Sequence, residues 1–416
     1  MVRLVGFLAL IVALIGWLSA QSVSYDGYQV WRITVEKPAQ LNEISRLVRD
    51  VWMQRGKTLD VCLSPDEQAV LRKAGYTGEV LIKDVGALIR QQRTDFTPQG
   101  DGLFTRYLTL DELYAAMRQL AAQNPHLVQM TEIGKSIENR PIYALRLTKD
   151  PRRARVYPSR PQVVINSMQH AREWITPPAA LYLAYRLVAE YNTDMRVRES
   201  LDRMEIYVVP VVNPDGYVFT HTTNRLWRKN RRFNGRNFFN QPIYGVDLNR
   251  NWGVGWGGQG SSGNPSSDTY RGTAPFSEPE TYHLSRWMMG LPQLRAHVDL
   301  HSYSQMILWP WGYTSDLPPF NSVFERVGLA MQTAIEGVHG QFYVAGPIAT
   351  TIYVAGGGMT DWVFGVRGAL SFTYELRDTG QFGFLLPPDQ ILPTCEEVYP
   401  ALLELLRWAL RRDWSE

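Results

Sequence analysis

The 416-residue sequence predicts an α/β fold. We expect a mixed, mostly parallel central sheet flanked by helices, preceded by a small α/β sandwich domain. From residue 107 onward, short apolar runs of strand length alternate with segments of helical periodicity. Such uninterrupted apolar strands are typical of a buried, mostly parallel sheet. The clearest runs are 163–165, 206–212, 298–300 and 370–374.

Residues 21–93 form a separate compositional unit. Strand-like and helix-like patterns alternate in it in the order β-α-β-α-β, which suits a small sandwich. The second helix has a clear start, because Ser64 can cap it and Pro65 fits its first turn. The expected strands are 28–35, 59–63 and 79–83, and the first expected helix is 40–53.

Three helix starts are expected in the long unit. Thr109 with Glu112 forms the pattern of a capping box and predicts a helix over 109–122. Thr176-Pro177 predicts a second start, and Thr394 with Glu397 predicts the start of the last helix.

Residues 1–20 are typical of a secretory signal peptide. Arg3 is the only charge before Asp26, an apolar run follows it, and Ser19-Ala20 offers small residues for cleavage. The run is short for a spanning helix, although a retained anchor is the alternative. We therefore expect a secreted, extracellular protein.

The stretch 94–106 is polar, contains Gly and Pro, and is expected to be an exposed linker before a domain at 107–416. Proteolysis favours such linkers, so Arg93 is a plausible cleavage site for a trypsin-like protease. The formal charge of +3 is small for this length and argues for neither a nucleic-acid nor a membrane partner.

Polar residues follow three of the expected strands, where sites form in open α/β sheets. His170 and Glu173 follow the first, His301 follows the second, and Glu375 follows the third. Two histidines and one carboxylate would leave one coordination position open, as in catalytic zinc sites. His-x-x-Glu spacing alone also arises by chance, and His297 shares a strand face with His301. We prefer His301 because it lies at the strand end.

Two basic segments and a glycine-rich segment are further candidates. The basic segments, 224–232 and 246–252, suit solvated loops, nucleic-acid binding, or guanidinium recognition of a carboxylate. The segment 350–362 has three glycines after Tyr353 and suits either a mobile loop or an ordinary turn.

These segments together resemble the digestive zinc carboxypeptidases of the A/B type over essentially the whole chain. The resemblance rests on six motifs in the family's order. They are His-Ala-Arg-Glu-Trp at 170–174, Asn-Arg-Leu-Trp-Arg-Lys at 224–229, Asp-Leu-Asn-Arg-Asn-Trp at 247–252, His-Ser-Tyr-Ser-Gln at 301–305, Thr-Thr-Ile-Tyr at 350–353 and Glu-Leu-Arg-Asp-Thr-Gly at 375–380.

The resemblance implies a zymogen that removes residues from peptide and protein C-termini with one Zn²⁺ per chain. Residues 21–93 would be an inhibitory propeptide, released by the activating protease. The implied metal ligands are His170, Glu173 and His301, the general base is Glu375, and Arg228 faces the oxyanion. Asn249 and Arg250 would hold the substrate carboxylate, Tyr353 would cover the bound residue, and Arg172 and Tyr303 would line the outer cleft.

The same resemblance bears on specificity. Thr360 stands where B-type enzymes place an Asp, and Ile348 and Gly312 are similar to A-type residues. A neutral pocket predicts a preference for apolar or aromatic terminal residues. The alternatives are B-type specificity for Lys and Arg, and an inactive peptide-binding homologue. The lone Cys395 of the long unit departs from the family's disulfide.

Overall fold

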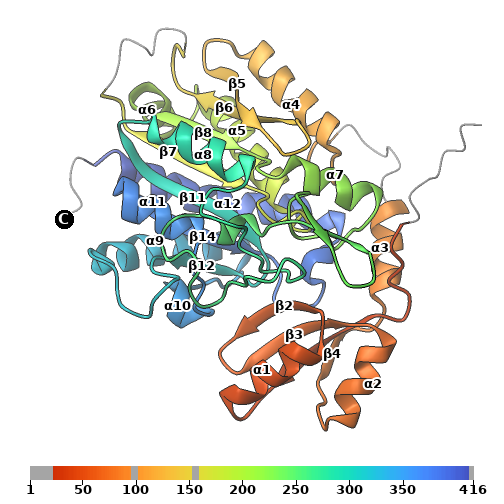
Figure 1. Ribbon diagram of the computed structural model, residues 1–416. Helices are drawn as coiled ribbons and strands as arrows, with labels where there is room; N and C mark the ends of the chain where they lie inside the picture. The colour runs from red at the N-terminus through yellow and green to blue at the C-terminus, as the bar shows by residue number, and fades with distance from the viewer. Residues whose placement is uncertain (1–21, 95–101, 152–158, 412–416) are drawn as a thin grey trace, which may run out of the picture.

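The computed structural model describes residues 22–94, 102–151 and 159–411. The predicted signal peptide and most of the predicted linker lie outside these residues. Across the described ranges, no helix is long and apolar enough to cross a membrane. The predicted α/β class with a small preceding sandwich is confirmed (Figure 1).

The first domain is an antiparallel four-stranded sheet with two helices on one face. Its strand order is β2-β3-β1-β4. The elements are β1 (Gln29–Thr34), α1 (Pro38–Leu47), β2 (Asp50–Arg55), β3 (Thr58–Leu63), α2 (Pro65–Lys73) and β4 (Glu79–Ile82), and α3 (Val85–Thr94) leads out of the domain. Alternation along each strand gives the sheet two buried faces. Trp31 and Ile33 pack beneath the helices, whereas Val30 packs against the larger domain.

The predicted helix over 40–53 is wrong in its second half. Helix α1 ends at Leu47, and residues from Asp50 onward form strand β2. Val51 and Trp52 are β-branched and aromatic residues that favour a pleated surface, and β2 pairs with β3. Their helical spacing was coincidental, because pairing with a neighbouring strand outweighs a weak periodic signal.

The second domain is built on a mixed eight-stranded sheet of order β13-β12-β14-β11-β7-β8-β6-β5. Neighbours are parallel from β14 through β11 and β7 to β8, and again between β12 and β13. The strands are β5 (Val128–Lys135), β6 (Pro141–Leu147), β7 (Gln162–Ser167), β8 (Glu205–Val209), β11 (Leu294–Ser302), β12 (Met306–Trp309), β13 (Val344–Pro347) and β14 (Leu370–Leu376). A separate hairpin pairs β9 (Phe233–Arg236) with β10 (Pro242–Tyr244).

Helices cover both faces of this sheet (Figure 1). The larger core cluster contains buried side chains of α4 (Leu110–Gln123), α5 (Thr176–Glu190), α6 (Met195–Arg203), α9 (Asn321–His339) and α12 (Ile391–Ala409). The smaller one contains side chains of α8 (Pro279–Met289) and α11 (Met359–Arg367). The remaining helices are α7 (Pro214–Thr222), α10 (Ile348–Thr351), η2 (Leu248–Arg250), η3 (Gly383–Leu385) and η4 (Pro388–Gln390).

Two predicted helix starts are confirmed and one is wrong. Thr109 caps α4 through the predicted capping box with Glu112. Helix α5 begins at Thr176 as expected, but Thr176 is its first residue and Ile175 occupies the cap position. Helix α12 begins at Ile391, so Thr394 lies inside it. The Thr394 hydroxyl donates to the Gln390 carbonyl, and Glu397 pairs with Arg377. The capping-box pattern was misleading there because both side chains have tertiary or intrahelical partners.

Both cysteines are buried and free, one in each domain. Neither domain therefore depends on a disulfide, and the cores described above supply the stability instead.

Candidate functional site

The parallel strands β7, β11 and β14 end side by side and bring the predicted metal ligands together. His170 and Glu173 lie in the turn after β7, and His301 lies near the end of β11. One ligand atom of each residue lies within 4.8 Å of the other two. His170 Nδ1 is 2.7 Å from Glu173 Oε1, and His301 Nδ1 is 3.0 Å from Glu173 Oε2. All three side chains are buried.

The donor chemistry fits a zinc ion. Two imidazole nitrogens and one carboxylate converge, which is a ligand set of catalytic zinc sites with an open fourth position. In each histidine Nδ1 faces the cluster, so Nε2 is free for a second partner. His170 Nε2 lies 3.1 Å from Asp247 Oδ1, and His301 Nε2 lies 2.7 Å from Asp299 Oδ2. Such outer carboxylates orient metal-binding histidines and fix their tautomer.

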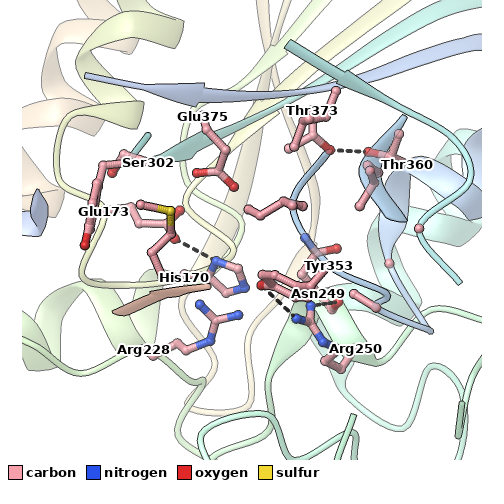
Figure 2. A pocket seen from close by; sticks show the side chains of 18 of the residues that line it. His170, Glu173, Arg228, Asn249, Arg250, Ser302, Tyr353, Thr360, Thr373 and Glu375 are labelled. Carbon is pink, nitrogen blue, oxygen red and sulfur yellow. Dashed lines mark hydrogen bonds and ion pairs between the residues drawn. The ribbon is translucent and has the colours of Figure 1, made fainter. Parts of the chain in front are cut away.

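Glu375 and Arg228 extend toward the same space from opposite sides in Figure 2. Glu375 is the register partner of His301 on the adjacent strand β14. Burial raises the pKa of Glu375 to about 8, and the nearby carboxylate of Glu173 adds to the rise. Arg228 Nη2 donates to Asp247 Oδ2 at 2.9 Å, so Asp247 connects Arg228 to His170.

Asn249, Arg250 and Tyr353 form a second polar group in the same pocket (Figure 2). Arg250 Nη2 donates to the Tyr353 hydroxyl at 3.3 Å, and Asn249 Oδ1 accepts from the Met359 backbone N–H. Arg250 is only 3% exposed. Its Nε and Nη1 donate to the backbone carbonyls of Gly260 and Asn249. Among the described residues no carboxylate makes an ion pair with Arg250, so its guanidinium can bind an anionic ligand.

One end of the pocket is mostly apolar. The hydroxyls of Thr360 and Thr373 lie 2.6 Å apart and satisfy each other (Figure 2). Asp361 also reaches the lining, but its carboxylate accepts from the backbone N–H groups of Gly312 and Tyr313. Burial raises the pKa of Asp361 to about 6. The apolar lining consists of Leu308, Ile348, Ile352 and Ala355.

Arg172 and Tyr303 lie where the two domains meet. Arg172 Nη1 donates to Asp50 Oδ1 at 2.8 Å, and the Tyr303 hydroxyl donates to Asp60 Oδ2 at 3.0 Å. Trp52 of the first domain packs edge-on against Tyr303 and also lines the pocket. The pocket is therefore built from both domains.

Three buried aspartates of the site were not predicted from the sequence: Asp247, Asp299 and Asp361. The signal for Asp299 was present, because His297, Asp299 and His301 alternate along one strand and must share a face. His297 is not part of the group of converging ligand atoms, and its ring contacts Ser371 and Asn166 instead. The preference for His301 over His297 agrees with this geometry.

The fold and the site thus define an α/β protein in which two histidines and one carboxylate, a donor set that could hold a metal ion, converge at the carboxyl ends of parallel strands. The family model described as zinc carboxypeptidase matches residues 113–401. The chain belongs to the zinc carboxypeptidase family, and it is a zinc-dependent metallocarboxypeptidase, which acts on peptide C-termini.

Two curated relatives match at nearly full length. The chain is 36% identical over 429 residues to carboxypeptidase A1 of Sus scrofa, covering 98% of this chain and 100% of the relative. It is 35% identical over 420 residues to carboxypeptidase A2 of Mus musculus, covering 95% and 97%.

Solved structures agree with this assignment. The thrombin activatable fibrinolysis inhibitor superposes with a TM-score of 0.83 at 28% identity, covering 92% of this chain and 99% of that chain. Carboxypeptidase A from Helicoverpa armigera gives a TM-score of 0.83 at 29% identity, covering 92% and 98%. Both likenesses extend over the first domain as well as the second, because each covers more of the chain than the second domain alone.

Proposed function

We propose that this enzyme is a secreted carboxypeptidase zymogen that prefers apolar or aromatic C-terminal residues. One observation carries the proposal: His170 and Glu173, whose donors converge with that of His301, line the same pocket as Glu375 and Arg250, and no described carboxylate makes an ion pair with Arg250. In this proposal the three donors hold the zinc ion.

Glu375 acts as the general base. When bound, zinc polarises the scissile carbonyl and lowers the pKa of a water molecule to about 7. The Glu375 carboxylate takes a proton from the attacking water and delivers it to the leaving amine nitrogen. Its position on β14, beside His301 in register, aims it at this space.

Arg228 stabilises the negative charge that develops on the carbonyl oxygen. Asp247 supports this role, because it fixes the guanidinium while also accepting from His170. A fixed donor of this kind is typically worth about 3–4 kcal/mol in the transition state.

Arg250 restricts cleavage to chain ends. Its buried guanidinium binds the terminal carboxylate, with Asn249 beside it and Tyr353 covering the terminal residue. A longer chain would bring no carboxylate there and would leave the cation unpaired in a buried position, which is costly.

The terminal side chain enters the end of the pocket at Thr360. That end offers paired hydroxyls and the apolar lining, and Asp361 is already occupied by two backbone donors. Asp361 is the one acidic residue among the described residues at this end of the pocket, and its engagement with the backbone favours the A-type preference over the B-type alternative.

The first domain acts as an inhibitory propeptide. Trp52 and Met53 line the pocket, and the Asp50–Arg172 and Asp60–Tyr303 contacts hold β2 and β3 against its outer part. The connection between the domains contains Arg93, at the end of α3, as the proposed site for a trypsin-like activating protease. The signal-like residues 1–20 support secretion.

A panel of blocked dipeptides tests this proposal on the enzyme after trypsin treatment. We expect release of Phe and Leu but not Arg, and loss of turnover on treatment with a zinc chelator. Preferential release of Arg would favour B-type specificity. An absence of release from any peptide, with zinc present and the first domain removed, would favour an inactive homologue.

A further inference from the structure

A buried polar network on strand β11 lies behind the three proposed metal ligands, His170, Glu173 and His301. The side chains of His297, Asp299 and His301 alternate along this strand and share one face of the sheet. The intervening Ala296, Val298 and Leu300 belong to the larger hydrophobic cluster on the other face. The sequence therefore places a carboxylate two residues before His301, within the interior of the sheet.

Asp299 is fully buried and accepts from three side chains. Asn166 Nδ2 donates to Oδ1 at 2.7 Å, Gln169 Nε2 donates to Oδ2, and His301 Nε2 lies 2.7 Å from Oδ2. Among the described residues no Lys or Arg makes an ion pair with it. An uncompensated carboxylate in such a position is expensive, so its charge requires another source of compensation.

The geometry assigns the tautomer of His301. Asn249 Nδ2 also lies 3.2 Å from His301 Nε2, but Asn249 Oδ1 accepts from the Met359 backbone, which turns the amide nitrogen toward the ring. An amide nitrogen cannot accept a hydrogen bond, so Asp299 is the partner for a proton on Nε2. That proton leaves Nδ1 with its lone pair directed at the cluster.

Two further contacts hold Asp299 in place. Gln169 Oε1 accepts from Trp252 Nε1 at 3.0 Å, so the amide nitrogen of Gln169 points at Asp299. Asn166 Oδ1 lies 2.7 Å from His297 Nε2, and His297 Nδ1 lies 2.8 Å from Ser371 Oγ. Burial lowers the pKa of His297 to about 4, so this ring is neutral and serves as a hydrogen-bonding link.

We propose that Asp299 is a positioning residue of the metal centre, which holds His301 in its Nε2–H tautomer and slows zinc loss. The inference rests on the proposed function, since it requires His301 to be a zinc ligand. The metal charge and the three donors together compensate the buried carboxylate. The buried carboxylate of Asp299 therefore strengthens the binding of the cation beyond what the three ligands alone would provide.

The test measures zinc dissociation from the full-length zinc-loaded chain into excess chelator. We expect Asp299→Asn to lose zinc about 10- to 100-fold faster than the wild type. The matched control is Asp361→Asn, which changes another buried carboxylate of the pocket that contacts no ligand, and it should lose zinc at the wild-type rate. The visible spectrum of the Co²⁺-substituted protein should change for Asp299→Asn and not for the control.

Melting of the metal-free proteins separates positioning from general stability. Asn166 and His297 can both reorient around an amide at 299, so metal-free Asp299→Asn should melt no lower than the metal-free wild type. A wild-type rate of zinc loss in Asp299→Asn, with a wild-type cobalt spectrum, would overturn the proposal. If Asp299→Asn does not fold, Gln169→Met removes one donor to Asp299 and should also accelerate zinc loss, and an unchanged rate would count against the proposal.

A His301→Ala variant distinguishes this inference from the proposed function beneath it. Tight zinc binding in His301→Ala would contradict the proposed ligand set itself. Weak binding in His301→Ala together with unchanged zinc loss in Asp299→Asn would leave the ligand set standing and reject the role of Asp299.

Discussion

Single residues of the site illustrate what a strand pattern can and cannot predict. The position of His170, Glu173, His301 and Glu375 at strand ends predicted that they would meet, and the structure brings them together. Asp247 and Asp361 lie in an η2 cap and in α11, where nothing in their local pattern distinguishes them from surface acids. Their partners come from distant segments, so only the fold reveals them.

Glu375→Gln tests the proposed base. The amide keeps the size of the side chain and cannot accept the proton of water, so we expect zinc to remain bound. Turnover should fall by about 10²- to 10⁴-fold, the usual contribution of a general base. Metal analysis beside steady-state kinetics checks both parts, and near-normal turnover would show that another group is the base.

Thr360→Asp tests the pocket. A carboxylate there would replace the hydroxyl that hydrogen-bonds to Thr373. It would also be buried without a cation unless the substrate supplies one. We expect kcat/KM for Phe release to fall and that for Arg release to rise, each by at least about 10-fold. Thr360→Val is the control, because it keeps the shape without the charge and should not admit Arg. If Thr360→Asp and Thr360→Val showed the same ratio of Phe release to Arg release, residue 360 would not determine the specificity.

At the scale of elements, local signals worked where no distant partner competed with them. The Thr109–Glu112 capping box formed as predicted, because its hydrogen bonds are made within one turn. The region 48–53 and the start of α12 were mispredicted, because β2 gains a sheet partner and Glu397 gains Arg377. The sequence did not predict the outer strands β5, β6, β12 and β13, because β12 and β13 are only four residues long and most of β5 is not buried.

Glu112→Gln tests the electrostatic part of that cap. Hydrogen bonding to Arg106 lowers the pKa of Glu112 from 4.5 to about 2. A lowered folded-state pKa stabilises the fold above pH 4.5, and this contribution is lost as pH falls toward 2. We expect the variant to melt slightly below the wild type at pH 7, and the difference to shrink across that window. A difference that is independent of pH would mean that the charge of Glu112 is irrelevant.

At the scale of the whole molecule, the two-domain plan followed from composition, but the interface did not. The sandwich face carrying Val30, Trp52 and Cys62 packs against Leu226, Tyr303 and Phe384 of the larger domain. Residue alternation predicts two faces for each strand and does not predict which partner covers the second one. Consequently the sequence did not predict the ion pair between Asp50 and Arg172.

Asp50→Ala tests whether this interface restrains the enzyme. The side chain of Arg172 is 1% exposed, so removing Asp50 leaves a buried guanidinium without its carboxylate. Loss of one partner of a buried charge pair typically costs about 2–5 kcal/mol, and here the cost falls on the docked state, because separation returns Arg172 to water. The uncut Asp50→Ala chain should therefore release C-terminal residues faster than the uncut wild type.

Two comparisons make that result specific. Glu43→Ala removes a carboxylate that accepts from Tyr76 within the first domain, so it should leave the activity of the uncut chain unchanged. After trypsin treatment all three proteins should have the same kcat/KM, since the first domain is then removed. Equal activity of the uncut Asp50→Ala and wild-type chains would show that the Asp50–Arg172 pair does not hold the first domain over the pocket. High activity of the uncut wild type would remove the inhibitory role of the domain altogether.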